Sequence, residues 1–195
     1  MSLFSPLSAD TVEDSFSEAK LNDRALLRGD WKIENNIAFC KADPELYKKY
    51  NNHGPIIRYG KEFKDISVEF EMKAVDCQRV VFTLNGEGHV FRVCIMENST
   101  GKKYASSRII AWATQSSKEN KGETVQPDGF PNIADINSKW VKVKLDVKGN
   151  SGTLSIGDFT YKMEHDCLAR DKKEVTLSFA SGELSMRNFK MVSSE

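Results

Sequence analysis

The sequence has no net charge and no apolar run long enough to cross a membrane as a helix. Its 28 basic residues balance its 28 acidic residues, so no uniform electric field favours nucleic acid or an anionic membrane as a partner. The longest apolar runs are a few residues, far short of the ~18 that a membrane-spanning helix needs. The composition therefore argues against a basic-groove nucleic-acid binder and predicts no membrane span.

Cysteine is scarce and carries no motif. Cys40, Cys77, Cys94 and Cys167 are widely spaced, and no CxxC pair is present for zinc binding or redox work. Lone cysteines commonly behave as small core residues. We expect four buried free thiols, although spacing alone leaves the disulfide state open.

A secretory leader is also missing from the N-terminus, which has neither a basic start nor an apolar segment. Either the protein is cytoplasmic, or a leader was removed and the mature region begins near Phe4; we favour the extracytoplasmic interpretation. Residues 1–15 are polar and include Pro6, so we expect a flexible arm. Residues 16–195 are expected to form a single β-sandwich domain.

Alternation of apolar and polar residues is the clearest pattern present. Ile66–Lys73 alternates with period two, and Arg79–Leu84 and His89–Met96 follow, separated by a glycine-containing turn. These segments are rich in β-branched and aromatic residues, and they predict an antiparallel meander of three strands.

Other segments extend the β pattern along the chain. Leu26–Cys40 predicts a hairpin with Ile37 and Phe39 among its buried members, and further strands are expected at Trp140–Ile156 and Glu174–Val192. Asp43-Pro44 predicts one short helix over 44–50. About ten strands with regular turns and hardly any helix predict an all-β fold of two packed antiparallel sheets.

The least regular stretch is Glu97–Lys139, in which only Arg108–Thr114 reads as a strand. A long irregular excursion from a compact domain is often functional, so we expect binding loops there. Its Asp128, Asn132 and Asp135 offer oxygen ligands, but their spacing fits no EF-hand loop, so calcium is only weakly indicated and no other cofactor is expected.

Four segments resemble the 3-keto-disaccharide hydrolase domain family, whose members are concanavalin A-like lectin/glucanase jelly rolls of the glycosyl hydrolase kind. The likeness covers most of the chain from Phe16 onward. It is carried by an opening hairpin, a central strand, a tryptophan-led strand and a closing Arg-Asn strand, which are Trp31–Ile37, Phe63–Met72, Lys139–Val143 and Leu184–Met191. The resemblance implies a jelly-roll sandwich and a carbohydrate ligand bound on a concave sheet.

The chain departs from this family where members carry polar site residues. Thr83 stands where a strand ends in arginine, and Val90 stands where members have a glutamate. Three interpretations therefore stay open: a glycoside hydrolase, a carbohydrate-binding module, and a structural or protein-interaction sandwich with a filled groove.

Glu69 and Glu71 are the candidate catalytic residues. Two apart on a strand, they project from one face with carboxylates on the order of 7 Å apart. Inverting glycosidases use a similar separation, and Arg92 is expected to assist. The alternative is a solvated sheet face balanced by Lys73.

Candidate ligand-binding residues are those that can hydrogen-bond or stack on a sugar ring. Arg92 is expected in the concave groove, whereas His89, three residues earlier, would point to the opposite side of a regular strand unless it belongs to the turn. An aromatic ring beside an arginine suits a pyranose, and burial of the tryptophan is the alternative. The set is Arg92, Trp112, His89, Tyr104 and Arg58.

Overall fold

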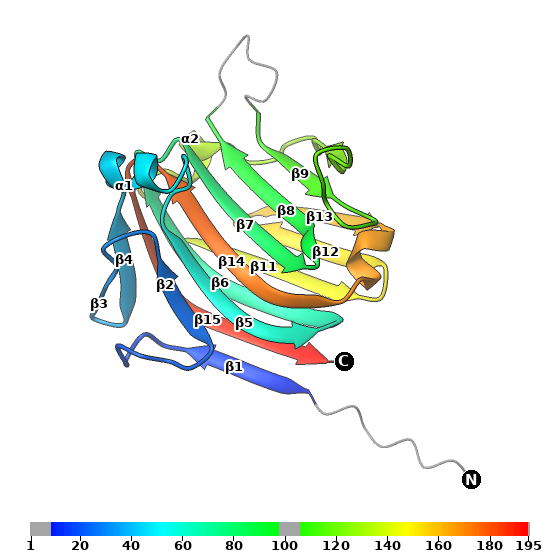
Figure 1. The fold of residues 1–195 in the computed structure, drawn as a ribbon, viewed down its shortest axis with the longest axis horizontal. Helices are drawn as coiled ribbons and strands as arrows, with labels where there is room; N and C mark the ends of the chain where they lie inside the picture. Colours follow the sequence, from blue (N-terminus) through cyan, green and yellow to red (C-terminus); the bar gives the residue numbers. More distant parts are fainter. Residues whose placement is uncertain (1–8, 98–105, 195) are drawn as a thin grey trace.

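The computed structural model describes residues 9–97 and 106–194, which form two antiparallel sheets packed face to face (Figure 1). Within the described residues, eight strands form sheet A. In spatial order they are β13 (Phe159–Glu164), β12 (Ser151–Ile156), β11 (Val141–Lys148), β6 (Asp65–Val75), β15 (Glu183–Ser194), β4 (Ile37–Lys41) and β3 (Lys32–Glu34), with β1 (Asp10–Asp14) pairing on β15.

Sheet B has seven strands in the same part of the chain. Their spatial order is β10 (Glu123–Val125), β9 (Arg108–Ala111), β8 (Gly88–Met96), β7 (Arg79–Gly86), β14 (Lys172–Ala180), β5 (Ile56–Phe63) and β2 (Arg24–Leu27). The helical segments are short: α1 (Pro44–Lys49), α2 (Ile133–Ile136) and the 3-10 turn η1 (Asp166–Ala169). The predicted all-β jelly-roll sandwich is confirmed.

One hydrophobic core lies between the sheets and draws on both. Strand β6 shows the pattern that builds it, because its inward residues Val68, Phe70 and Met72 are at most 1% exposed while the residues between them face outward. The ring centroids of Phe70 in sheet A and Phe82 in sheet B are 5.5 Å apart. The period-two alternation thus decides which side of each strand is buried.

The predicted three-strand meander is wrong in its first step. Strand β6 pairs with β11 and β15 in sheet A, whereas β7 and β8 form a hairpin in sheet B. The turn between β6 and β7 carries the chain from one sheet to the other, with Asp76 at a φ of 54°. Alternation predicts a strand and its buried side, but it does not name the neighbouring strand.

The expected flexible arm is wrong over Asp10–Asp14, which form β1 at the edge of sheet A. Asp14 anchors this strand: both its oxygens accept from Nη1 of Arg24, at 2.9 and 2.7 Å, and Oδ2 also accepts from the Tyr59 hydroxyl at 2.8 Å. All three side chains are buried. Residues 1–8 of the expected arm lie outside the described residues.

Local sequence patterns predicted some features correctly and others incorrectly. The short helix is confirmed as α1, with the Asp43 side chain accepting from two backbone N–H groups at its start. In the second strand of the first hairpin, β4, the buried parity is the reverse of the prediction, because Ala38 and Cys40 are 0% exposed and Ile37 and Phe39 are half-buried. All four cysteines are free and buried, as expected.

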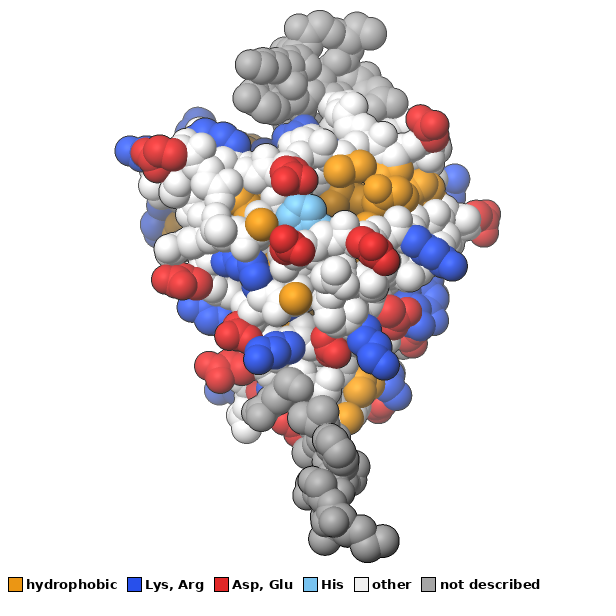
Figure 2. Space-filling model, turned by 90° about the vertical axis from the view of Figure 1, so that its right-hand side faces the viewer, with side chains coloured by type: hydrophobic (Ala, Val, Ile, Leu, Met, Phe, Trp, Pro, Cys, Tyr) orange, Lys and Arg blue, Asp and Glu red, His pale blue; other side chains and the backbone are white. Residues whose placement is uncertain are grey.

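The surface mixes charges of both signs. On the face drawn in Figure 2, acidic and basic side chains are interspersed around one hydrophobic patch. This agrees with the absence of a net charge on the chain. No helix within the described residues is long and apolar enough to span a membrane.

Candidate functional site

The outer face of sheet B, turned away from the core, gathers four of the five predicted ligand-binding residues. On β7, Phe82 and Leu84 lie in the core, so Thr83 and Asn85 face outward. The strand register then aligns side chains of β5, β14, β7 and β8 across the sheet. This cross-strand row is formed by Arg58, Thr176, Thr83 and Arg92.

A β-bulge brings His89 to the same face as Arg92. The pairing of β7 with β8 shifts between Leu84, opposite Phe91, and Asn85, opposite His89, so Val90 has no partner on β7. Val90 and Phe91 are both buried in the core. Because the bulge inserts one extra residue, His89 and Arg92 project together although they are three apart.

A continuous chain of side-chain contacts runs across four strands on this face; we call Arg58, Glu174, Asn85, His89 and Arg92 the polar chain. Arg58 Nη1 lies 3.8 Å from Glu174 Oε2, and Asn85 Nδ2 donates to Glu174 Oε1 at 2.9 Å. His89 Nδ1 donates to Asn85 Oδ1 at 2.8 Å, and Arg92 Nη2 donates to His89 Nε2 at 2.6 Å. Every link crosses between strands or spans the bulge.

These contacts define the protonation state of His89. Its Nε2 accepts from a guanidinium, so the ring is neutral and carries its proton on Nδ1. Burial and the adjacent positive charge of Arg92 lower the pKa of His89 to about 4. Burial also lowers the pKa of Arg92, with Arg79 and Arg108 acting in the same direction.

Trp112 is not the open stacking platform that the sequence suggested. It is 5% exposed and packs with Cys94 and Ile110 in a small apolar cluster separate from the main core. Gly122 covers it so closely that a Cβ there would lie 2.8 Å from the indole ring. Trp112 supports Arg92, whose guanidinium carbon lies 5.6 Å from the ring centroid.

A cavity of about 230 Å³ adjoins the polar chain on the same face. Arg92 lines both features. Four arginines from different strands or loops contribute to this cavity, which we call the arginine pocket: Arg28, Arg79, Arg92 and Arg108. Its other polar lining residues are Asn52, His53 and Ser178.

Glu69 and Glu71 do not join this site, so their predicted cooperation with Arg92 is wrong. They lie on the outer face of sheet A, since β6 belongs to that sheet. Glu69 pairs with Lys142 at 3.0 Å. Glu71 accepts from Arg187 at 2.6 and 2.9 Å and from Asn188 at 2.9 Å.

The environment of Glu71 is that of a structural carboxylate. Its bonds to Asn188 and Arg187 lower the pKa of Glu71, which is the reverse of what a general acid needs. Arg187 also stacks on Trp140, with its guanidinium carbon 4.1 Å from the ring centroid. The Arg-Asn and tryptophan motifs behind the family resemblance thus hold the outside of sheet A together.

The sequence also singled out Tyr104 and a set of oxygen ligands for calcium. Tyr104 falls outside the described residues. Asn132 and Asp135, considered for calcium, form a capping box at the start of α2, where their side-chain oxygens accept backbone N–H groups. In the described part of the chain no group of three or more His, Cys, Asp or Glu side chains could hold a metal ion.

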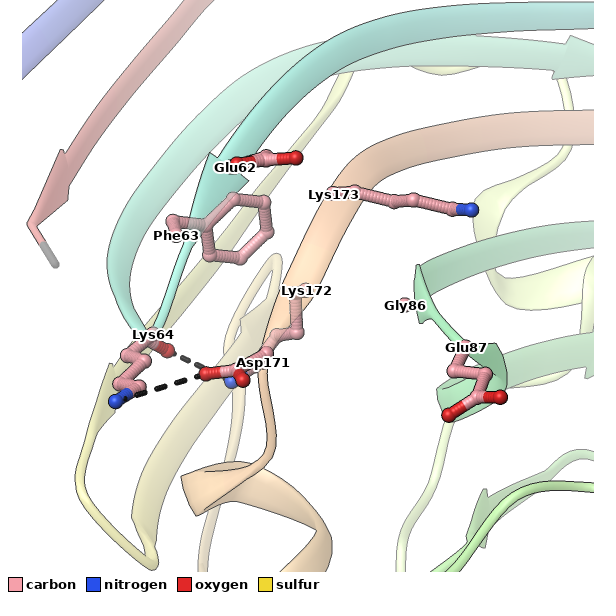
Figure 3. A pocket seen from close by; sticks show the side chains of 8 residues that line it. All are labelled: Glu62, Phe63, Lys64, Gly86, Glu87, Asp171, Lys172 and Lys173. Atoms are coloured by element: carbon pink, nitrogen blue, oxygen red, sulfur yellow. Dashed lines mark hydrogen bonds and ion pairs between the residues drawn. The ribbon is translucent and has the colours of Figure 1, made fainter.

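A second cavity, of about 420 Å³, lies where β5 and β7 end and β14 begins (Figure 3). Two of its lysines contact protein groups. Lys64 pairs with Asp171 at 3.7 Å, and the buried Lys172 donates to the carbonyls of Lys64, Leu168 and Arg170 at 2.6–2.7 Å. This cavity contains none of the predicted ligand-binding residues.

Sequence reasoning missed Asn85 and Glu174, two of the five members of the polar chain. Asn85 was assigned to a turn, although β7 extends to Gly86. Glu174 is separated from Asn85 by 89 residues in sequence. The alternation of Glu174 with the buried Val175 and Leu177 on β14 was the available signal, but the pairing of β14 with β7 was not.

Comparison with known proteins supports the fold and no closer relationship. No family model matches the chain, and neither does any curated protein. Similar solved structures include the CBM2 module of the evolved Dit of Lactobacillus casei BL23 phage J-1, with a TM-score of 0.68, 9% identity and coverage of 96% of this chain and 97% of that one.

Two bacterial proteins are also similar to this chain in structure. Bacillus licheniformis β-glucanase has a TM-score of 0.64 and 11% identity, covering 95% of this chain and 98% of its own. The carbohydrate binding module CBM66 from Bacillus subtilis has a TM-score of 0.56 and 10% identity, covering 86% and 94%. At these identities the likeness shows the fold alone, a concanavalin-like jelly-roll sandwich.

Proposed function

We propose that the protein binds a saccharide on the outer face of sheet B. The polar chain is the observation that carries this proposal, because it fixes donors and acceptors from four strands on one face of the sheet. Sugar hydroxyls each donate and accept, so they are recognised by such preorganised side chains. The expected loop segment, in its described residues 106–139, contributes β9 and β10 to this sheet.

The similar structures favour the same class of ligand. One is a carbohydrate binding module by its own description, and another is a β-glucanase. A fold alone does not determine function, so the proposal depends on the side chains of this face and takes only the general ligand class from the comparison.

The geometry supports binding of a saccharide without cleavage of its glycosidic bonds. Two carboxyl groups about 5–9.5 Å apart flank the bond in most glycoside hydrolases. The polar chain contains one carboxylate, Glu174, and its oxygens face Asn85 and Arg58. The Glu69–Glu71 pair lies on the outside of the other sheet.

A protein-interaction or structural sandwich is the second candidate. The burial of Trp112 against Cys94 and Ile110 favours it, because these side chains fill one part of the face with apolar groups. It predicts that no saccharide binds and that the outer face of sheet B is covered by another protein.

The two candidates are separated by a glycan array followed by calorimetry on the full chain. Replacing Asn85→Ala removes the middle of the polar chain and leaves His89 Nδ1 and Glu174 without their shared partner. We expect the affinity for any saccharide found to fall about tenfold or more. Thr160→Ala, on the exposed strand β13 of sheet A, is the control and is expected to bind as the natural chain does. Absence of any glycan ligand, or equal affinity of the Asn85→Ala variant, would contradict saccharide binding at this face.

A further inference from the structure

The arginine pocket concentrates positive charge on a protein whose net charge is zero. Arg79, Arg92 and Arg108 come from neighbouring strands β7, β8 and β9, and Arg28 follows β2. Among the described residues that line the cavity there is no carboxylate. The charge is therefore local, and it faces one hollow on the proposed binding face.

Neutral groups hold these side chains in place. Arg79 Nη2 donates to the Tyr47 hydroxyl at 3.2 Å and to the Asn52 carbonyl at 3.4 Å. The Arg28 guanidinium carbon lies 6.0 Å from the centroid of the Tyr50 ring. Within residues 9–97 and 106–194, neither arginine forms an ion pair, so their positive charge is not neutralised by that part of the protein.

Arg92 adds an unused donor. Its Nε is buried and has no hydrogen-bond partner among the described residues. A buried unsatisfied donor is destabilising, and repulsion from Arg79 and Arg108 adds to the cost of this charge. An anionic group in the pocket would relieve both effects.

We propose that the arginine pocket receives an anionic substituent, a sulfate or a carboxylate, of the saccharide that lies along the polar chain. This inference rests on the proposed function and specifies its ligand as an acidic saccharide. The planar guanidinium fork matches the oxygens of both groups. A volume of about 230 Å³ lies below the roughly 300–1,000 Å³ of pockets for drug-sized ligands, so it suits one substituent or one ring.

Calorimetry with two matched pairs of saccharides tests the inference on the full chain. Sulfated carrageenan oligosaccharides are compared with the same oligosaccharides after chemical desulfation, and oligogalacturonate with its methyl ester. We expect one acidic member to bind about tenfold or more tightly than its neutral counterpart. Raising NaCl from about 50 to about 500 mM should reduce that ratio, because salt screens the charge interaction. The pair that shows the larger acidic-to-neutral ratio tells whether the pocket takes a sulfate or a carboxylate.

Variants connect the preference to the pocket. Arg79→Gln and Arg28→Gln each remove one charge outside the polar chain, and we expect both to lower the acidic-to-neutral ratio at least about threefold. Lys162→Gln removes a charge from the exposed strand β13 of sheet A and should leave the ratio unchanged. Because Arg28 lies in a loop, its variant is informative even if Arg79→Gln folds poorly.

The outcomes separate this inference from the proposed function. Equal binding of acidic and neutral saccharides, or a ratio that neither arginine variant changes, would overturn the anionic pocket and leave saccharide binding in place. Failure of every saccharide, neutral or acidic, would remove both proposals together.

Discussion

Arg92 donates a 2.6 Å hydrogen bond to Nε2 of His89 across a bulge in a single strand. On a regular strand residues three apart face opposite sides, and one of these polar side chains would enter the core. The unpaired Val90 takes that inward place. The bulge therefore creates the contact and, with it, the neutral state of the His89 ring.

This neutral ring predicts a dependence of stability on pH. The folded pKa of His89 is lowered to about 4 from an ordinary value of 6.5, so between these pH values the unfolded chain binds a proton that the folded chain does not. The stabilisation is complete above pH 6.5 and is lost as the pH falls toward 4. It amounts to at most about 3 kcal/mol, and less where water reaches the half-buried ring.

The variant His89→Gln isolates this effect, because glutamine can donate and accept but does not titrate. Urea unfolding at pH 7.5 and at pH 4.5 should show a smaller loss of stability in the variant than in the natural chain. The exposed His53 provides the control as His53→Gln. Identical pH profiles for the natural chain and His89→Gln would contradict a neutral, half-buried His89.

The strands were predictable from alternation, but the arrangement of the site was not. Alternation shows that Glu71 and Arg92 lie on strands, yet the sheet to which each strand belongs depends on contacts such as Arg187 with Glu71, 116 residues apart. No turn residue at Val90 indicates the bulge in the sequence. Pairing and bulges are decided by long-range packing, so Arg58, His89 and Arg92 could be proposed singly but not as a connected group.

Two glutamates in similar settings are expected to differ in function. Glu174 contacts Asn85 and Arg58 on sheet B, and Glu71 contacts Asn188 and Arg187 on sheet A. We expect Glu174→Gln to weaken saccharide binding about tenfold, since a charged hydrogen-bond acceptor of the polar chain is lost. Glu71→Gln should leave binding unchanged. Calorimetry on both variants checks this, and a loss of binding in Glu71→Gln alone would move the site to sheet A.

The buried pair of Asp14 and Arg24 is expected to be important for stability. Both side chains are at most 8% exposed, and Asp14 also accepts from Tyr59. Removing one partner leaves the other charge buried, so Asp14→Asn should lower the free energy of unfolding by about 3–5 kcal/mol. Asp10→Asn breaks the exposed pair with Lys61 and should cost less than about 1 kcal/mol. Similar losses in both variants, measured by urea unfolding, would contradict a critical buried pair.

The four buried thiols are expected to be unreactive in the folded protein. Burial raises the pKa of Cys40 to about 12 and that of Cys77 and Cys167 to about 11. Thiolate is the reacting form, so a thiol reagent at about pH 8 should modify few of them within minutes. After unfolding without reductant all four should react. A shortfall of two would reveal a disulfide.

Two glycines test how tightly Trp112 is enclosed. Gly122 and Gly129 have similar left-handed φ angles, +75° and +71°, so Gly→Ala costs about 1–2 kcal/mol of backbone strain at either position. Only Gly122 has close neighbours: its Cβ would lie 2.6 Å from the Ala111 carbonyl and 2.8 Å from the Trp112 ring, whereas nothing lies within 4 Å at Gly129. Gly122→Ala should therefore lose about 1–3 kcal/mol more than Gly129→Ala in urea unfolding. Equal losses would mean that the segment over Trp112 moves aside readily, and the indole ring could then open to a ligand after all.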